Sequence, residues 1–324
     1  MERSVDFNRD RRMACRQCGH EWTVDLEWVE RWNQGDEDCP DCGTTCEAEN
    51  AAQFTVLEDD PALDHGVTTQ LGWYHTTTYP DWPPTIDFAA SLTDDTRRMM
   101  AGDEAVERWA HRQVTKALHI GSYESAIHNM VRRMSDQGDQ GNQFYLYRVY
   151  LNPEVVILPG WIPDPSNFLG DVDLDEVGGP DVEAVRYVNF HEDPGGLSLA
   201  IRPTAIGTSQ CLAIPLQIDE DEAWIVDAVA RLSSDPPDEP LPIGLSQFRH
   251  LLGKSPRTET AAAAGSVLVE RLPINLRHQF QAATRWHPES EPTKWAHCAA
   301  GIAALIENPA RVLAELDAQA PREH

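Results

Sequence analysis

Four of the seven cysteines stand in two Cys-x-x-Cys pairs, and a glycine directly follows each pair. The four residues are Cys15, Cys18, Cys39 and Cys42. Zinc binds four thiolates in a tetrahedron, a Cys-x-x-Cys turn supplies two of them, and glycine tolerates the tight bend beside the sulfurs. The spacing therefore predicts a zinc ribbon over residues 1–50 that holds one structural Zn²⁺. Four thiolates leave no open position on the metal, so we expect it to do no chemistry and to matter little to a distant active site.

Three later stretches combine histidine, tyrosine, serine and acidic side chains at the ends of expected strands. They are residues 72–77 (Gly-Trp-Tyr-His-Thr-Thr), residues 118–122 (Leu-His-Ile-Gly-Ser) and residues 187–198 (Tyr-Val-Asn-Phe-His-Glu-Asp-Pro-Gly-Gly-Leu-Ser). A single histidine at a strand end is usually structural, and a glutamate before Asp-Pro-Gly-Gly is most simply a turn residue. The order of the three stretches within one segment is what indicates a site.

Together the three stretches resemble the ADP-ribosyltransferase superfamily, in particular its polymerase-like branch with a His-Tyr-Glu arrangement and the relatives of that branch on phages and mobile elements. The resemblance covers about residues 71–216. Residues 74–77 are similar to the Tyr-His-Gly-Thr of such proteins, and residues 120–122 to their Phe-Gly-Thr before a helix. The third stretch is similar to their Tyr-x-Asn-x-x-Glu, Gly-containing turn and Ser, which here are Tyr187, Asn189, Glu192, Gly195, Gly196 and Ser198.

This resemblance implies roles for individual residues. Breaking the nicotinamide–ribose bond of NAD gives the ribose oxocarbenium character, which a carboxylate stabilises, and Glu192 takes that role. His75 takes the role of a donor that holds the adenosine ribose and fixes the dinucleotide in register. Either Tyr123 or Tyr187 is expected to stack on nicotinamide. The full set implied to bind NAD is His75, Thr76, Gly121, Ser122, Tyr123 and Tyr187.

The function implied is NAD-dependent transfer of ADP-ribose to a macromolecule with release of nicotinamide. One alternative is an NAD glycohydrolase, which uses water as the acceptor. Another is a catalytically silent adaptor that binds partners through the zinc ribbon and the C-terminal helices. Thr76 favours the adaptor because it stands where the family usually has glycine, and a β-branched residue cannot make the same close backbone approach.

The acceptor stays open between protein and nucleic acid, because acceptor choice lies in the loops around a site. Several arginines in or beside the ribbon would help contact with nucleic acid; they are Arg9, Arg11, Arg12 and Arg16. The overall charge opposes such contact. The 324 residues carry 53 acidic and 26 basic side chains, a formal charge of −27, which repels phosphate backbones.

Hydropathy excludes a membrane protein. No stretch has the roughly 18 consecutive apolar residues that span a bilayer, and the charged N-terminus has no apolar signal core. We therefore expect a cytoplasmic protein without membrane contact. In that reducing compartment, cysteine pairs indicate metal binding rather than disulfides.

The pattern of apolar residues predicts an α+β fold. Residues 143–151 have apolar side chains on both faces, as in a central strand covered on both sides. Other strands are expected at 71–76, 117–120, 155–158, 185–190, 197–201 and 210–216, and helices at 103–115 and 123–134. The resemblance implies that these strands form split antiparallel β-sheets with flanking helices.

The chain divides into three segments. They are the ribbon (1–50), the ADP-ribosyltransferase-like segment (55–218) and a helical segment (219–324). Helical spacing of apolar residues begins after Asp219, and a well-marked helix follows Asn308, which can cap, and Pro309, which suits the first turn. We expect the helical segment to be a small domain or a cover, and a candidate surface for a partner protein.

Overall fold

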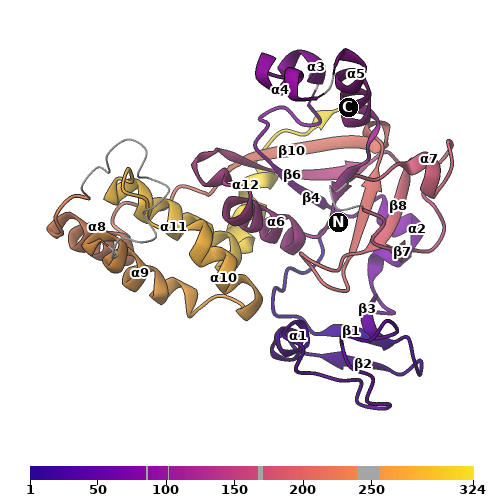
Figure 1. The fold of residues 1–324 in the computed structure, drawn as a ribbon, viewed down its shortest axis with the longest axis horizontal. Coiled ribbons are helices and arrows are strands. Elements are labelled where there is room, and N and C mark those ends of the chain that lie inside the picture. The colour runs from indigo at the N-terminus through magenta and orange to yellow at the C-terminus, as the bar shows by residue number, and fades with distance from the viewer. Residues whose placement is uncertain (85–86, 101, 167–170, 239–254) are drawn as a thin grey trace.

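The computed structural model describes residues 1–84, 87–100, 102–166, 171–238 and 255–324 (Figure 1). A small three-stranded ribbon lies at one end of the molecule, two β-sheets lie in the middle, and a group of C-terminal helices lies to one side. The predicted α+β class is confirmed.

The ribbon contains strands β1 (Arg11–Cys15), β2 (Glu21–Val24) and β3 (Ala52–Thr55) and helix α1 (Leu26–Asn33). Its strand order is β2-β1-β3, and both pairs are antiparallel. The Asp25 side chain begins α1 by accepting a hydrogen bond from the Trp28 amide. Because β3 pairs with β1, the sheet of the ribbon extends to Thr55.

Eight strands form the two central sheets. Their bounds are β4 Trp73–Thr77, β5 Leu118–Ile120, β6 Phe144–Leu151, β7 Ile162–Pro163, β8 Ala184–Val188, β9 Leu197–Ile201, β10 Ile206–Ile214 and β11 Arg322–Glu323. The strand orders are β11-β10-β6-β4 and β5-β9-β8-β7, and every pair except β7–β8 is antiparallel. The sheets touch where Tyr74 and Gly121 exchange backbone hydrogen bonds of 2.8 and 2.9 Å. Strands β4 and β5 therefore meet at one point, and the sheets separate there.

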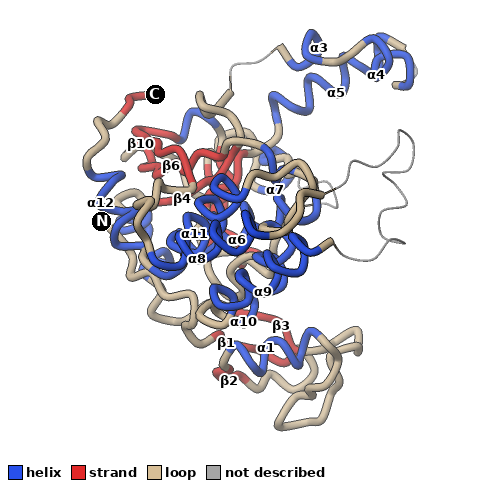
Figure 2. The backbone as a smooth tube through the Cα atoms, turned by 90° about the vertical axis from the view of Figure 1, so that its left-hand side faces the viewer, coloured by secondary structure: helices blue, strands red, loops and turns tan. Residues whose placement is uncertain are grey.

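Short and long helices surround these sheets. Their bounds are η1 Pro61–Leu63, α2 His65–Thr68, α3 Phe88–Ser91, α4 Asp94–Met99, α5 Asp103–Thr115, α6 Tyr123–Asp136, η2 Asp139–Gly141, α7 Leu174–Val177 and η3 Pro203–Ala205. Helix α6 packs against β4, and most of its first three turns is buried. Helices α3, α4 and α5 project from the edge of the molecule (Figure 2).

Five further helices follow the sheets in the described part of the chain. They are α8 Ala223–Ser234, α9 Pro256–Val269, α10 Ile274–Ala283, α11 Pro292–Glu307 and α12 Pro309–Asp317. One hydrophobic cluster joins them to the rest, because Phe280 and Leu305 pack together with Ile127 of α6 and Phe144 of β6. The helices are therefore a cover that shares a core with a sheet. Asn308 caps α12 as predicted, by accepting a hydrogen bond from the Arg311 amide.

Both ends of the chain return to the central sheets. The Gly72 amide donates to the carbonyl of Met1, and Glu2 forms an ion pair of 2.9 Å with Arg148 on β6. At the other end, β11 pairs with β10. Residues before the ribbon thus belong structurally to the central part.

Most of the predicted central elements are present, with small shifts at their ends. The strand expected at residues 155–158 is wrong. Ile157 forms only a single bridge with Ala184, and the paired strand β7 begins at Ile162 instead. The chain between them turns at Gly160, which has a φ of 75°. Among the helices of the described residues, none is long and apolar enough to cross a bilayer.

Candidate functional site

The four predicted cysteines come together at one end of the ribbon. Their sulfur atoms all lie within 4.8 Å of one another. A tetrahedron with metal–sulfur bonds of about 2.3 Å has sulfur–sulfur edges of about 3.8 Å. The distances from Cys15 to Cys42 and from Cys18 to Cys39 are 3.7 and 3.8 Å. The cluster is therefore suited to hold a metal ion such as zinc.

Two matching turns build this cluster. In the first, the Gly19 amide donates to the Cys15 carbonyl, and in the second the Gly43 amide donates to the Cys39 carbonyl, both at 2.9 Å. The two glycines have φ values of 75° and 69°, a region that favours glycine. Of the seven cysteines, Cys46 is the nearest in sequence that lies outside the cluster.

The β8–β9 loop holds Glu192 in a fixed turn. The side-chain oxygen of Asn189 accepts hydrogen bonds from the amides of residues 191, 192 and 193, at 2.9, 2.8 and 3.2 Å. The Asn189 amide donates to the Gly196 carbonyl at 2.8 Å and closes the loop. Asn189, which the sequence singled out only as part of a pattern, thus acts as the organiser of the loop.

Glu192 points toward helix α6. Its Oε1 atom lies 3.0 Å from Arg132, and its side chain is 18% exposed. No described residue hydrogen-bonds its Oε2 atom. The backbone carbonyl of Glu192 accepts a hydrogen bond of 2.8 Å from Nδ1 of His128, a ring whose pKa burial lowers. One carboxylate oxygen of Glu192 is therefore available to a ligand.

The next residue, Asp193, points the opposite way into a buried polar network. Its carboxylate accepts from Arg9 at 2.6 Å and from Ser122 at 2.8 Å, and Arg11 lies 3.4 Å away. Asp193 is 3% exposed and Arg11 is 2% exposed. Burial acts to raise the pKa of Asp193, but the two arginines outweigh it and hold that pKa below its usual value. Burial and the neighbouring Arg9 lower the pKa of Arg11 to about 10, so it stays charged at neutral pH.

This network joins the ribbon to the Glu192 loop. Arg11 is the first residue of ribbon strand β1, and Asp193 directly follows Glu192. A Cβ atom on Gly195 would lie 3.0 Å from the Thr55 carbonyl of β3, so the loop also packs closely on the ribbon backbone. The ribbon that carries the cysteine cluster therefore contacts the loop that carries Glu192, although the contact is made from the start of β1 and not from the cysteines.

His75 is half-buried on β4 and lies between two partners. Its Nδ1 atom lies 2.8 Å from the carbonyl oxygen of His119 on β5, and its ring stacks on Trp82 at 4.5 Å between centroids. A carbonyl only accepts, so Nδ1 carries the proton. Burial lowers the pKa of His75 to about 4, so the ring is neutral at pH 7. Its Nε2 atom is then an acceptor, and no described residue bonds it.

Tyr187 on β8 lies on the other side of His119. Its hydroxyl is 2.9 Å from Nδ1 of His119. Burial raises the pKa of Tyr187 above its ordinary value, and the charge of Glu192 adds to that rise. Tyr187, His119 and His75 therefore form a connected series from β8 through β5 to β4.

The other predicted site residues have structural contacts. Thr76 is 1% exposed, and its hydroxyl donates to the Ala126 carbonyl at 2.8 Å. Tyr123 is 2% exposed, and its hydroxyl donates to the Leu305 carbonyl at 2.8 Å. Ser122 caps α6, and a Cβ atom on Gly121 would lie 2.8 Å from Oγ of Ser198. These four residues shape the junction between β5 and α6, and the Tyr123 ring leaves no face open for stacking on a ligand.

Sequence reasoning missed the charged partners of the two acidic residues. Arg132 was inside a predicted helix, and nothing in the sequence pairs it with Glu192. Arg9 and Arg11 were expected to be available to nucleic acid, but Asp193 occupies both. Arg9 and Arg11 are two residues apart, which is the spacing of side chains on one face of a strand. That spacing is the only feature of the sequence that suggests a shared partner.

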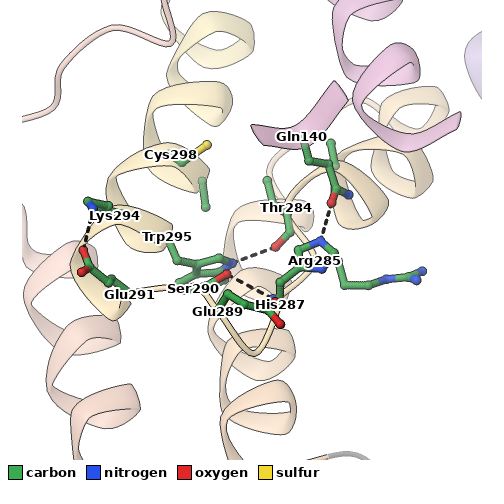
Figure 3. A pocket seen from close by; sticks show the side chains of 12 residues that line it. Gln140, Thr284, Arg285, His287, Glu289, Ser290, Glu291, Lys294, Trp295 and Cys298 are labelled. Atoms are coloured by element: carbon green, nitrogen blue, oxygen red, sulfur yellow. Dashed lines mark hydrogen bonds and ion pairs between the residues drawn. The ribbon is translucent and has the colours of Figure 1, made fainter. Parts of the chain in front are cut away.

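Two cavities lie away from these residues. One, of about 290 Å³, lies between η2, the end of α10 and the start of α11 (Figure 3). Trp295 donates there to the Thr284 carbonyl at 2.8 Å, and His287 hydrogen-bonds Gln140. Its volume is at the lower limit of small-ligand pockets, which hold about 300 Å³ or more. The second cavity borders α5 around Trp109, and neither includes a predicted NAD-binding residue.

Comparison of the chain with protein-family models, with curated proteins and with solved structures gave no match.

The buried network generates a prediction about stability. Asp193→Asn keeps the shape of the side chain but leaves Arg9 and Arg11 without their carboxylate, which costs about 3 kcal/mol or more of unfolding free energy. A matched control is Asp139→Asn, because Asp139 pairs with Arg133 at 2.7 Å where both side chains are partly exposed. That change should cost at most about 1 kcal/mol. Urea unfolding measures both, and equal losses would refute the central role of Asp193.

The lowered pKa of His75 should make the free energy of unfolding depend on pH. The pKa of an imidazole is 6.5 in the unfolded chain and about 4 in this fold. As the pH falls, the unfolded chain therefore takes up the proton first. The contribution of the neutral His75 ring to the free energy of unfolding is complete above pH 6.5 and is lost as the pH falls toward 4. The shift corresponds to about 3 kcal/mol.

His75→Gln keeps a donor for the His119 carbonyl and does not titrate. Urea unfolding at several pH values should therefore show the largest difference between wild type and variant at pH 7 and a shrinking difference toward pH 4. A difference that does not change with pH would mean that His75 is not held neutral by the fold.

Proposed function

We propose that the protein is an NAD-dependent ADP-ribosyltransferase that releases nicotinamide and transfers ADP-ribose to a macromolecule. One observation carries the proposal. The three stretches of the resemblance, far apart in the chain, contact one another where the two sheets separate, through Tyr74 and Gly121, His75 and His119, and His119 and Tyr187. Antiparallel sheets that part between β4 and β5 also agree with the arrangement that the resemblance implies.

In this proposal His75 positions the dinucleotide. Its neutral ring presents Nε2 as an acceptor, which suits the hydroxyl of a ribose. The contact with the His119 carbonyl fixes the tautomer, and Trp82 fixes the plane of the ring. His75 thus accepts from ribose, the reverse of the donor role expected from the sequence.

Glu192 supplies the negative charge. When the bond between nicotinamide and the ribose anomeric carbon breaks, the electron pair leaves with nicotinamide and the ribose becomes cationic. The free Oε2 atom of Glu192 stabilises that charge, while Arg132 holds Oε1. A nucleophile of the acceptor then bonds to the anomeric carbon and loses its proton to solvent. Tyr187 rather than Tyr123 borders this site, because its hydroxyl lies in the series that ends at His75.

We also propose that Zn²⁺ is the ion that the four cysteines hold. The sulfur–sulfur distances and the all-thiolate donor set fit it. The bound ion supplies no reaction chemistry and ties the two Cys-x-x-Cys turns together. The ribbon then holds Arg11 on β1 against Asp193, and so positions the Glu192 loop.

Nicotinamide release from NAD tests the proposed reaction. Glu192→Gln keeps the shape but removes the charge needed in the transition state, so we expect at least a hundredfold lower turnover, about 3 kcal/mol, with little change in NAD affinity. Its control is Glu37→Gln, because Glu37 pairs with Arg31 at 2.6 Å and its side chain is similarly exposed at 22%. The control should retain wild-type turnover.

Three outcomes separate the alternatives. Wild-type turnover in Glu192→Gln would remove Glu192 from the reaction. Release of nicotinamide with label found only in free ADP-ribose would indicate a glycohydrolase. A wild-type protein that neither binds nor consumes NAD would indicate the adaptor.

Metal analysis of two cysteine variants tests whether the ribbon binds zinc and holds the Glu192 loop. We expect one zinc per chain in the wild type and in Cys46→Ser, and loss of zinc in Cys39→Ser because one of four ligands is gone. Nicotinamide release should fall in Cys39→Ser and persist in Cys46→Ser, since the ribbon holds the Glu192 loop. Full activity without zinc would show that the loop keeps its geometry without the ribbon.

A further inference from the structure

A continuous row of aromatic rings crosses the surface of the ribbon. It consists of His20, Trp22 on β2, and Trp28 and Trp32 on α1, and we call it the aromatic row. His20 stacks on Trp22 with centroids 5.4 Å apart, Trp22 meets Trp28 edge-on at 5.8 Å, and Trp28 stacks on Trp32 at 5.2 Å. All four side chains are half-buried. The small ribbon core is formed by other residues, among them Met13 and Val29, so the row packs against it from outside.

The surface around the aromatic row is acidic. Residues 11–55 contain ten carboxylate side chains and four arginines. Arg11 is buried with Asp193, and Arg12 pairs with Glu21 and Glu58. Arg31 pairs with Glu37, which leaves Arg16 as the ribbon arginine without an ion pair among the described residues. Acidic residues adjoin the row in the chain, because Glu27 directly precedes Trp28 and residues 36–38 follow Trp32. Four thiolates around a divalent ion would add further negative charge.

Half-buried aromatic rings at an acidic surface suit a basic ligand. Guanidinium and ammonium groups bind over the face of tryptophan, and tryptophan is the best ring for this contact. Carboxylates at the rim steer a cationic partner and repel a polyanion. Bases of single-stranded nucleic acid also stack on aromatic rings, but the excess of carboxylates over arginines in the ribbon repels their phosphates. The negative charge of the ribbon therefore favours a basic polypeptide over a nucleic acid as the partner.

We propose that the aromatic row binds a basic, extended polypeptide segment and presents it to Glu192 as the acceptor of ADP-ribose. The second half of this statement rests on the proposed function. The position of the ribbon supports it, because β2 pairs with β1, which carries Arg11 at the Glu192 loop. Neighbouring strands lie about 5 Å apart, and an extended chain advances about 3.3 Å per residue. A segment held on the row thus reaches the loop within several residues.

Binding is tested without NAD, by fluorescence anisotropy of a labelled peptide of alternating arginine and serine. Peptides of alternating glutamate and serine and a mixed-sequence single-stranded DNA serve as competitors of other charge. We expect the arginine peptide to bind, to weaken with salt, and to lose about tenfold in affinity in Trp28→Ala. Trp161→Ala is the matched control, because Trp161 is 40% exposed and lies outside the ribbon. It should bind like wild type.

A second variant, which changes charge and leaves the tryptophans in place, tests the proposal even if Trp28→Ala disturbs the ribbon. Glu27→Lys changes an exposed side chain without an ion pair in the described residues, and should weaken the arginine peptide several-fold while zinc content stays unchanged. The proposal is overturned if the arginine peptide fails to bind, if both ribbon variants bind it like wild type, or if the DNA binds in its place.

The acceptor role has a separate readout. With labelled NAD, Trp28→Ala should lower label transfer to the arginine peptide by about the factor by which it weakens peptide binding, and Trp161→Ala should transfer label like wild type. Peptide binding without any transfer, in a protein that does release nicotinamide, would overturn the acceptor role alone. Peptide binding in a protein that does not consume NAD would overturn the proposed function and leave the docking surface standing.

Discussion

The buried carboxylate of Asp193 is the constraint on which the rest of the structure depends. It lies at the point where ribbon strand β1, the start of α6 and the β8–β9 loop meet, and it bonds Arg9 and Ser122 directly. Removing a buried charge from water is costly unless partners compensate for it, so these elements are stable only in one relative arrangement. Glu124, nearby on α6, adds a second buried carboxylate whose pKa burial raises, with the charge of Asp193 adding to that rise. The arginines of the N-terminal segment are thus required to neutralise the site's own acidic groups.

Adjacent residues in one loop divide two tasks. Asp193 points inward and fixes the loop, whereas Glu192 points toward Arg132 and keeps one oxygen for a ligand. The turn that Asn189 organises is what allows neighbouring side chains to face opposite directions. The cysteine cluster, which could hold a metal ion, lies at the other end of the ribbon and shares strand β1 with the contact to this loop. In the proposed function, strand β1 therefore links zinc binding to the geometry of the loop and to the charge of Glu192, although the metal takes no part in the proposed reaction.

Local patterns in the sequence predicted what depends on local physics. The spacing of the cysteines placed all four in one cluster, and the apolar pattern of residues 143–151 placed a buried strand at β6. Contacts between distant segments were not predictable in this way. Arg9 and Asp193 are 184 residues apart, and an arginine near the N-terminus carries no mark of burial. Tyr123 was expected at a ligand because it follows Gly121-Ser122, but helix α6 turns its ring toward Leu305 and the covering helices.

A crystal structure of the Glu192→Gln protein with NAD bound would test the proposed NAD site most directly. We expect a ribose hydroxyl of NAD to lie within hydrogen-bond distance of Nε2 of His75, and the nicotinamide ribose to lie against the side chain at position 192. Tyr187 should border the same ligand, and Tyr123 should stay in the core. NAD bound elsewhere, for example in the cavity around Trp295, or no NAD in the crystal at saturating concentration, would contradict the proposed site.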